Sequence, residues 1–315
     1  MTSVIVLGQP YWGRQIARAV DAPADGLRAE FIPQRAYPRL LLRRRSEDML
    51  LMRAGYRVGA TTARGRLFDA YWSLMRRSFR DAVACHYWLG SDVLDTINEA
   101  RAGTLRWAAL RGAADDLHLA DAPWLVSELE SVGIHAVNAH VPVAHRAPVS
   151  PPPLPAEFSV LTYLATSRFE FYGGDVILEA ARRLPDVRFD VVGTTGMSDR
   201  QSPPNVRWHG WVTDMPRYYA NATVVVRIPR HDGLGETVVE GLLNARHVLY
   251  THEIPHVRTV WPATAETVVA ALAALRDDHL AHRLEPNLAG RAYALEAFDE
   301  ARLTGRLAAL LRERI

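Results

Sequence analysis

The chain has 315 residues, of which 49% are hydrophobic and 23% charged, and its net charge is only +2. The length suits two domains of ordinary size, and the composition is that of a soluble globular protein rather than of a disordered or collagen-like chain. The single cysteine, Cys85, excludes an internal disulfide and a cysteine-based metal cluster, so a reducing cytoplasm is the expected compartment.

Every strongly basic residue of the chain is arginine, because the sequence contains no lysine. This excludes Schiff-base lysine enzymes and nucleotide-binding P-loops, which both need a lysine. The chain begins with an apolar stretch that is typical of a first strand rather than of a signal peptide. No apolar run approaches the roughly 18 residues that a membrane-spanning helix needs.

The first half of the chain alternates predicted strands and helices. Strand Val4–Leu7 is followed by a turn that contains Gly8 and Gly13 and by a helix that we expect to begin near Arg14. Helix-capping residues and apolar runs predict the next elements. These are strand Ala82–His86, helix Val93–Ala100, a helix with Asp121 as its N-cap and Pro123 in its first turn, and strand Ile134–Asn138.

A proline-rich segment separates the two halves. Between Val141 and Glu157 the sequence contains six prolines, which exclude a helix interior or a central strand and favour a semi-rigid extended linker. We therefore expect a first domain over residues 1–147, a linker over 148–157, a second domain over 158–290, and a C-terminal helix over 291–315 that can pack back on the first domain.

The second half repeats the strand–helix alternation. The predicted strands are Phe158–Leu164, Val187–Val192, Val206–His209, Thr223–Ile228 and His247–Tyr250, and the predicted helices are Asp175–Leu184, Met215–Ala220, Glu236–Ala245 and much of Asn287–Ile315. Apolar strands that alternate with amphipathic helices indicate parallel sheets covered on both faces. The fold class is therefore α/β, with two doubly wound domains and a cleft at the carboxyl ends of their strands.

Several common site patterns are missing from the sequence. There is no G-x-G-x-x-G after a strand, no G-x-S-x-G and no D-x-D pair, so dinucleotide and hydrolase sites are not supported. The histidines His247, His252 and His256 straddle a predicted strand end, and we expect no metal site there or elsewhere.

The segment His231–Gly241, with the sequence HDGLGETVVEG, carries the main functional signal. It lies between a strand that ends at Pro229 and a helix that starts near Glu236. Gly233 and Gly235 allow the backbone to approach a ligand closely, and the helix N-terminus offers unpaired N–H groups to an anion or a hydroxyl.

This segment resembles the E-x7-E signature of retaining GT-B glycosyltransferases of the family 4 type, written P-S-x-x-E-G-F-G-x-x-x-x-E-A. Leu234 stands at the aromatic position of the signature, and the residues that match it are Pro229, Gly233, Gly235, Glu240 and Gly241. The resemblance continues upstream through Asn205–Ala222 and through the R-x(n)-Y-K-G-x-D segment, here Arg168 to Asp175. It covers roughly 100 residues of the second half, whereas the first half is similar only in layout.

The resemblance implies a GT-B fold of two Rossmann-like domains facing a central cleft. It also implies a nucleotide diphosphate sugar as co-substrate, no cofactor, and transfer of the sugar with retention to an unidentified acceptor. Glu240 would bind the ribose, Arg168 would neutralise the diphosphate, and Asp232 would contact the sugar. The other donor-binding candidates are Gly233, Leu234, Gly235, Gly13, Gly173, Gly174 and Trp211. The candidate catalytic residues are Asp232, Arg168 and His86. His86 is included because family histidines at comparable strand ends contact the sugar.

Two positions depart from the family pattern. Asp232 replaces the first glutamate, which can change the preferred sugar, and Gly173 replaces the phosphate-binding lysine. Either Arg168 and the Gly173–Gly174 backbone suffice, or another arginine such as Arg14, Arg230 or Arg258 substitutes, or activity is lost. Two alternatives to the transferase therefore stay open: a sugar-nucleotide epimerase of the same architecture, and a non-catalytic protein that binds nucleotide sugars.

A basic region runs from Arg28 to Arg80, with thirteen arginines against four acids. It includes Leu40–Arg45 and Tyr71–Arg80, where arginines are interleaved with apolar and aromatic residues. Three uses are open: an anionic membrane surface at the inner face of the membrane, an anionic acceptor, or a solvated face. No nucleic-acid-binding module accompanies the charge, so nucleic acid is not an expected partner.

Overall fold

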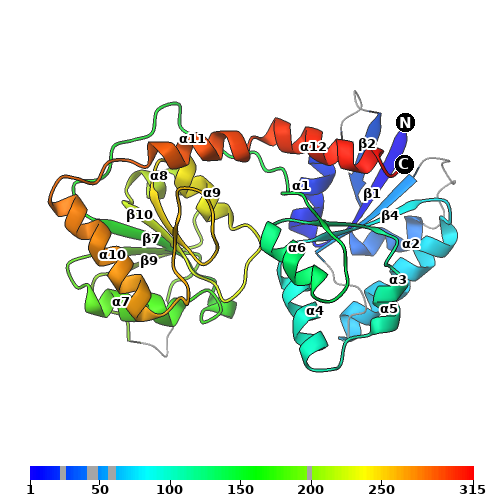
Figure 1. The fold of residues 1–315 in the computed structure, drawn as a ribbon, viewed down its shortest axis with the longest axis horizontal. Helices are drawn as coiled ribbons and strands as arrows, with labels where there is room; N and C mark the ends of the chain where they lie inside the picture. The colour runs from blue at the N-terminus through cyan, green and yellow to red at the C-terminus, as the bar shows by residue number, and fades with distance from the viewer. Residues whose placement is uncertain (22–25, 41–48, 56–61, 197–200) are drawn as a thin grey trace. The chain divides into compact units, whose positions relative to one another are not determined.

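The computed structural model describes residues 1–21, 26–40, 49–55, 62–196 and 201–315. The chain divides into two compact units (Figure 1). The first unit comprises Met1–Ala144 together with Phe298–Ile315, and the second comprises His145–Ala297. The polypeptide therefore leaves the first unit once and returns to it at the C-terminus.

The first unit is built on a parallel sheet with six strands in its described part, in the order β2-β1-β3-β4-β5-β6. The strands are β1 (Thr2–Gly8), β2 (Leu27–Phe31), β3 (Met49–Ala54), β4 (Val83–Trp88), β5 (Leu117–Ala120) and β6 (Val137–Asn138). β1, β3, β4 and β5 are almost wholly buried, as expected for parallel strands covered on both faces.

Helices cover both faces of this sheet. They are α1 (Pro10–Val20), α2 (Tyr37–Leu40), α3 (Ala63–Ser78), α4 (Ser91–Arg101), α5 (Trp107–Arg111), α6 (Pro123–Glu130) and α12 (Glu300–Arg312), with a short 3-10 turn at Gln34–Ala36. The last helix contributes Leu307, Ala308 and Leu311 to the same core as Val4 and Ile16. Residues far apart in the sequence thus complete one hydrophobic core.

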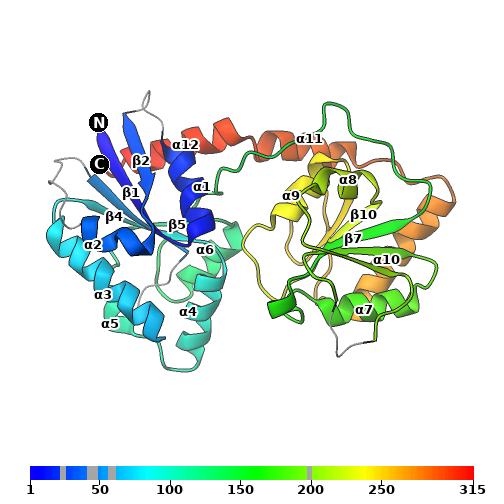
Figure 2. The same cartoon turned by 180° about the vertical axis from the view of Figure 1, so that it is seen from behind.

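The second unit contains another parallel sheet, with the order β12-β11-β10-β7-β8-β9. Its strands are β7 (Ser159–Tyr163), β8 (Arg188–Val192), β9 (Val206–Gly210), β10 (Val224–Arg227), β11 (His247–Tyr250) and β12 (Arg258–Thr259). Its helices are α7 (Gly174–Arg183), α8 (Met215–Ala220), α9 (Glu236–Leu243), α10 (Ala265–Leu280) and α11 (Leu288–Ala297), with a 3-10 turn at Thr166–Arg168. Helices α7 and α10 lie side by side, and α9 contacts α11 (Figures 1 and 2).

The proline-rich segment is tied to the second unit by hydrogen bonds to its carbonyl groups. Arg246, whose side chain is completely buried, donates to the carbonyls of Pro152 and Pro153. Arg291 donates to Pro148 at 2.6 Å, and His279 contacts the Pro155 carbonyl at 2.8 Å. The segment has no helix or strand, as predicted, but it is held against one unit rather than suspended between two.

Most predicted elements of the second unit agree with the structure to within a residue or two, whereas the first unit differs in several places. Helix α1 begins at Pro10, not near Arg14. Asp121 is not the N-cap of α6; Ala122 is, and the Asp121 carboxylate instead accepts the backbone N–H of Val141 at 2.9 Å. The sequence patterns did not predict β2, β3, β5, α2, α3 and α5 of the first unit, nor β12 and α10 of the second.

Candidate functional site

The sheet of the second unit changes its winding direction between β7 and β10. The chain moves from β7 towards β8 on one side and from β10 towards β11 on the other, so the two connections diverge at the carboxyl ends of these neighbouring strands. Ligands of open α/β sheets bind in the crevice at such a point. The segments that border it are 164–174, after β7, and 228–235, after β10.

The structure joins these two segments directly. The backbone N–H of Arg230 donates to the carbonyl of Phe171 at 2.8 Å, and Gly173 packs against Ile228. The fold therefore brings together one group of the predicted site residues at the carboxyl edge of a single sheet. They are Arg168, Gly173, Gly174, Asp232, Gly233, Leu234, Gly235 and Glu240.

Gly173 occupies a position that excludes a side chain. It is the N-cap of α7 with φ +80°, and a Cβ atom there would lie 2.8 Å from both the Cγ1 and the carbonyl oxygen of Ile228. An L-residue is strained in this left-handed conformation, and the backbone oxygen has no room to yield. The backbone conformation at this position thus requires a glycine. Gly173 therefore has a structural role, in addition to removing the cation that a lysine would supply.

Asp232 is held in a buried ion pair. Its two carboxylate oxygens accept the Nε and one terminal amino group of Arg227, each at 2.8 Å, and the Tyr250 hydroxyl lies 3.3 Å away. Burial lowers the pKa of Arg227, but the charge and hydrogen bonds of Asp232 outweigh it and leave the pKa raised. Both oxygens of Asp232 thus bond to Arg227, which gives this residue a structural role in the loop. Its contact with the sugar stays a prediction.

This ion pair also explains Gly235. A Cβ on Gly235 would lie 2.9 Å from the Arg227 Nε and 3.0 Å from the Asp232 Oδ2. The Tyr250 hydroxyl donates to the carbonyl of Gly233 at 2.8 Å. The conformation of the glycine loop is thus held by its contacts with Arg227, Asp232 and Tyr250.

Helix α9 begins directly after this loop, with Gly235 as N-cap and no side-chain cap. Its first backbone N–H groups therefore have no side-chain acceptor at the N-cap. The Thr237 hydroxyl, in the first turn, is buried and has no hydrogen-bond partner among the described residues. A ligand that accepts hydrogen bonds, such as a phosphate or a sugar hydroxyl, satisfies both kinds of group.

Glu240 lies in the second turn of α9 and accepts a short hydrogen bond, 2.5 Å, from the Tyr219 hydroxyl of α8. Burial raises the pKa of Glu240, and the Tyr219 hydrogen bond offsets part of the rise. Within the described part of the chain, that hydrogen bond uses only Oε2. The Oε1 oxygen is thus the one that can accept a ligand hydroxyl.

The candidate cations are distributed unevenly. Arg168 is half-buried, and its guanidinium lies 3.8 Å from the centre of the Phe171 ring, within the segment after β7. Arg230 is exposed on the other segment, 4.0 Å from Glu170. By contrast, Arg258 bonds to the Ala271 carbonyl and Arg14 belongs to the first unit. Arg168 and Arg230 are therefore the cations placed at the crevice.

Three predicted site residues lie elsewhere. Gly13 is inside α1, where a Cβ would meet the Phe31 ring at 2.6 Å, so it is a helix–strand packing residue. His86 is 1% exposed within β4 and bonds to Asp116 at 2.7 Å, which corrects its predicted place on a wall of the site. Trp211 follows the edge strand β9 and is 78% exposed.

Sequence reasoning missed four residues of this region: Arg227, Tyr250, Tyr219 and Thr237. An arginine that ends an apolar strand five positions before Asp232 was a usable signal for Arg227. The two tyrosines give no local signal, because each reaches the loop or α9 from another element.

Among the described residues, no group of three or more His, Cys, Asp or Glu side chains is arranged to hold a metal ion. No helix in that part of the chain has the length and apolar character to cross a membrane.

The chain is similar to known proteins in part of its sequence and in its fold. The model of the family described as "Glycosyl transferases group 1" matches residues 160–285. The sucrose-phosphate synthase of Thermosynechococcus elongatus is 13% identical with a TM-score of 0.73, over 99% of each chain. Anabaena HepE in complex with UDP-glucose is 13% identical with a TM-score of 0.70, over 99% of this chain and 100% of that one. The lipopolysaccharide outer core galactosyltransferase WaaB is 12% identical with a TM-score of 0.65, over 100% of both chains. No curated protein sequence matches.

Proposed function

Because residues 160–285 match the model of the family of glycosyl transferases group 1 and the chain has the GT-B fold, we propose a specific reaction for this glycosyltransferase. It transfers a sugar from a nucleotide diphosphate sugar to an acceptor. The transfer retains the configuration of the anomeric carbon and needs no metal ion. Retention is carried over from the resemblance of the His231–Gly241 segment to the E-x7-E signature.

The observation that carries this proposal is the convergence at the carboxyl ends of β7 and β10. The uncapped start of α9, the unpartnered Thr237 hydroxyl and the Oε1 oxygen of Glu240 belong to one helix. Donors for an anion and an acceptor for a hydroxyl thus stand about one turn apart. A nucleotide sugar offers the matching groups, a diphosphate and a ribose.

Each part of the donor then has a partner. The ribose hydroxyls donate to Glu240, and the diphosphate binds the N-terminal N–H groups of α9 and Arg168. Anabaena HepE, which shares this fold, was solved with UDP-glucose, and this supports a nucleotide sugar as the ligand. The sugar lies over the Gly233–Gly235 backbone.

Chemistry at this site consists mainly of positioning and of stabilising the leaving group. The bond between the anomeric carbon and the diphosphate oxygen breaks, the acceptor oxygen forms the new bond to that carbon, and the acceptor's hydroxyl proton passes to the departing diphosphate. Negative charge grows on the departing diphosphate, where Arg168 and the α9 N-terminus stabilise it. Asp232 acts through Arg227 as a positioning residue that keeps the loop in shape.

The direct test is a transfer and donor-hydrolysis assay with a panel of nucleotide diphosphate sugars, in the presence and absence of EDTA. We expect release of a nucleoside diphosphate that EDTA does not reduce. Complete loss of activity on chelation would contradict the metal-free proposal. Conversion of the donor to an epimer without any acceptor would contradict the transfer reaction.

The ribose role is tested by Glu240→Ala. We expect the dissociation constant of the nucleoside diphosphate to rise by about tenfold or more, because a hydrogen bond to a charged group contributes roughly 1.5–3 kcal/mol. The exposed Glu253→Ala is the matched control. Affinity of the Glu240 variant equal to that of the control would remove Glu240 from this role.

We also propose that part of the Arg28–Arg80 region contacts an anionic membrane surface on the acceptor side. Arg53 is fully buried, and Trp72, Met75 and Phe79 face the core, so the interleaved aromatic residues reflect an amphipathic helix. Leu41–Arg45 lie outside the described residues. Exposed Leu67 and Leu74 accompany the arginines of α3. Sedimentation with phosphatidylglycerol vesicles, compared with phosphatidylcholine vesicles, tests whether this face contacts anionic lipid; equal sedimentation would argue for a solvated face.

A further inference from the structure

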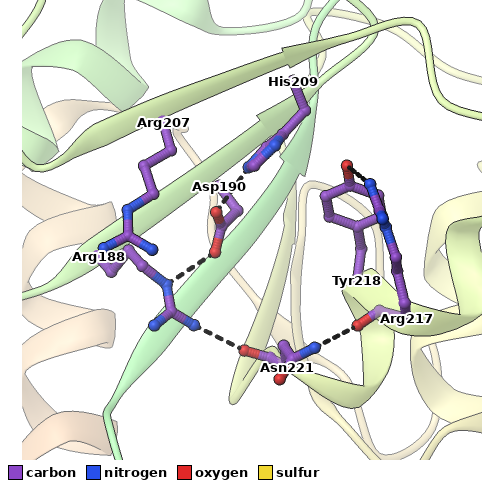
Figure 3. A pocket seen from close by; sticks show the side chains of 7 residues that line it. All are labelled: Arg188, Asp190, Arg207, His209, Arg217, Tyr218 and Asn221. Carbon is purple, nitrogen blue, oxygen red and sulfur yellow. Dashed lines mark hydrogen bonds and ion pairs between the residues drawn. The ribbon is translucent and has the colours of Figure 1, made fainter.

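A second polar site lies on the sheet of the second unit, away from the β7–β10 crevice. It is a cavity of about 350 Å³ beside β8, β9 and α8 (Figure 3). Seven residues line it: Arg188, Asp190, Arg207, His209, Arg217, Tyr218 and Asn221. Arg188 is the first residue of β8 and Asn221 precedes β10. The cavity thus extends to the amino-terminal ends of the strands, opposite to the crevice.

Strand periodicity places these side chains on one face. Arg188 and Asp190 alternate with buried Phe189 and Val191 along β8, and Asp190 is in register with Arg207 on β9. The apolar partners belong to the core with α7 and α10. The other face, beside the six-residue α8, is polar, although faces of parallel sheets are usually covered by apolar contacts.

The acidic residue of this cavity is already neutralised. Asp190 accepts the Nε of Arg188 at 2.9 Å and contacts the Nε2 of His209 at 2.7 Å. Arg188 also pairs with Glu157 and donates to the carbonyl of Asn221. In Figure 3 Asp190 and His209 lie between Arg207 and Arg188 on one side and Arg217 with Tyr218 on the other.

Two cations of the cavity form no ion pair with an acidic residue in the part of the chain that the structure describes, although Tyr218 and, less strongly, the charge of Asp214 raise the pKa of Arg217. Arg207 makes no hydrogen bond or ion pair with any described residue, and it is exposed. Arg217 donates to the Tyr218 hydroxyl at 2.7 Å and packs over the Tyr218 ring at 4.7 Å. Stacking on the ring fixes the plane of the Arg217 guanidinium before any ligand arrives. The cavity therefore presents two positive charges to an incoming anion.

We propose that this cavity is an anion site separate from the donor crevice, and that it binds the phosphoryl group of a phosphate monoester. Guanidinium groups match phosphate oxygens in a bidentate geometry, and two of them balance the dianion. The Tyr218 and His209 rings, 4.8 Å apart, offer an apolar wall to the ester group. The cavity volume is within the range of small-molecule sites. The same chemistry is available from a soluble sugar phosphate and from a lipid phosphate headgroup.

The test is calorimetric titration of the full chain with glycerol 3-phosphate, and co-sedimentation with vesicles that contain phosphatidic acid. The variant is Arg207→Gln with Arg217→Gln, and the matched control is Arg283→Gln with Arg312→Gln, which removes the same charge outside the cavity. We expect the dissociation constant to rise about tenfold for each arginine of the cavity. We expect the control to stay near the wild-type value and UDP binding to be unchanged.

The two probes identify the source of the phosphate. Binding of glycerol 3-phosphate that the cavity variant loses supports a soluble ester. Loss of sedimentation with phosphatidic acid vesicles, without soluble binding, supports a lipid headgroup. Equal affinity of wild type and cavity variant, equal weakening in the control, or no binding of either probe at millimolar concentration would overturn the proposal. Weakening of phosphate binding by Glu240→Ala would also overturn it, because the anion would then belong to the donor crevice.

Discussion

The ion pair between Arg227 and Asp232 changes the meaning of a signature residue. A carboxylate directly before the glycine loop suggests a contact with substrate, yet both of its oxygens bond to Arg227. The sequence contains Arg227, but it cannot say which carboxylate a buried guanidinium will meet. Glu240, by contrast, was predictable, because its spacing from the glycine loop places it on the same helix.

The structural role of Asp232 predicts a loss of stability. Asp232→Ala leaves Arg227 buried without its partner, which costs about 3–5 kcal/mol of unfolding free energy and weakens donor binding by disordering the loop. The pair Arg227→Met with Asp232→Leu is expected to recover most of the stability and part of the donor affinity. Urea unfolding and calorimetry measure both. Unchanged stability in Asp232→Ala, with donor affinity lost even in the double variant, would return Asp232 to the sugar contacts.

His86 is predicted to govern acid stability rather than catalysis. Burial, together with the charges of His118, Arg53 and Arg76, lowers its pKa well below 6.5. A depressed folded-state pKa contributes stability above the unfolded pKa, and this contribution is lost as the pH falls below about 6.5. His86→Gln keeps a hydrogen-bond donor for Asp116 and removes the titration. We therefore expect a smaller loss of unfolding free energy between pH 7.5 and pH 5.

Activity provides the second measurement on the same variant. Because His86 is buried within β4, the turnover number of His86→Gln is expected to stay near that of the wild type at neutral pH. His118 and His140 also have lowered pKa values, the latter about 4, so part of the acid sensitivity should persist. A variant with wild-type stability and no turnover would show that His86 takes part in catalysis.

At the level of elements, the helices and strands that could be predicted were those with a regular apolar pattern and a recognisable loop between them. β10 and β11 are apolar strands, and α9 between them is an amphipathic helix that follows a glycine loop. The limits of all three agree closely with the prediction. β3 was missed because its apolar run lies in a stretch dominated by arginines, one of which, Arg53, is inside the strand. Arg53 pairs with Asp69 and packs against the rings of Phe68 and Trp72, and all three residues come from α3.

The turn before α7, with Gly173 as N-cap, is expected to tolerate no side chain. Gly173→Lys restores the family residue, but it is expected to lower the unfolding free energy by more than the roughly 1–2 kcal/mol of a left-handed L-residue, because its Cβ also meets Ile228. Gly133→Lys is the control: it has φ +74° and no atom within 4 Å of the added Cβ. Thermal unfolding compares the two.

Activity assays complete that comparison. If a lysine were simply missing from the site, Gly173→Lys would raise the rate of donor turnover. We expect the rate to fall, since the start of α7 must shift to admit the side chain. A faster and equally stable variant would show that the turn accepts an L-residue.

At the scale of the whole molecule, each unit has its own sheet and its own core, and the first unit is closed by the last residues of the chain. Leu307 and Leu311 are at most 1% exposed in that core, and Arg18 of α1 bonds to Glu300 at 2.6 Å. The apolar face of this helix was visible in the sequence, because Leu303, Leu307 and Leu311 repeat every four residues. Which unit it would cover could not be determined from that repeat alone.

Leu307→Ala is therefore expected to destabilise the first unit by about 2–5 kcal/mol, the usual range for a leucine truncated in a packed core. Leu295→Ala, at a 45% exposed position of α11, is the control, with an expected change below about 0.5 kcal/mol. Hydrogen exchange shows where protection is lost. Loss in β7, β8 and β10, with β1 unaffected, would contradict the assignment of α12 to the first unit.

The return of the chain to its first unit has a consequence for biosynthesis. A ribosome releases residues 145–297 as one continuous stretch, so the second unit can complete its sheet while translation continues. The first unit must wait until α12 has left the exit tunnel, and until then the surface of β1 and α1 that α12 covers is open to water. The first unit thus begins to form before the second but is completed after it, and a chaperone that protects nascent chains would find its target in residues 1–144.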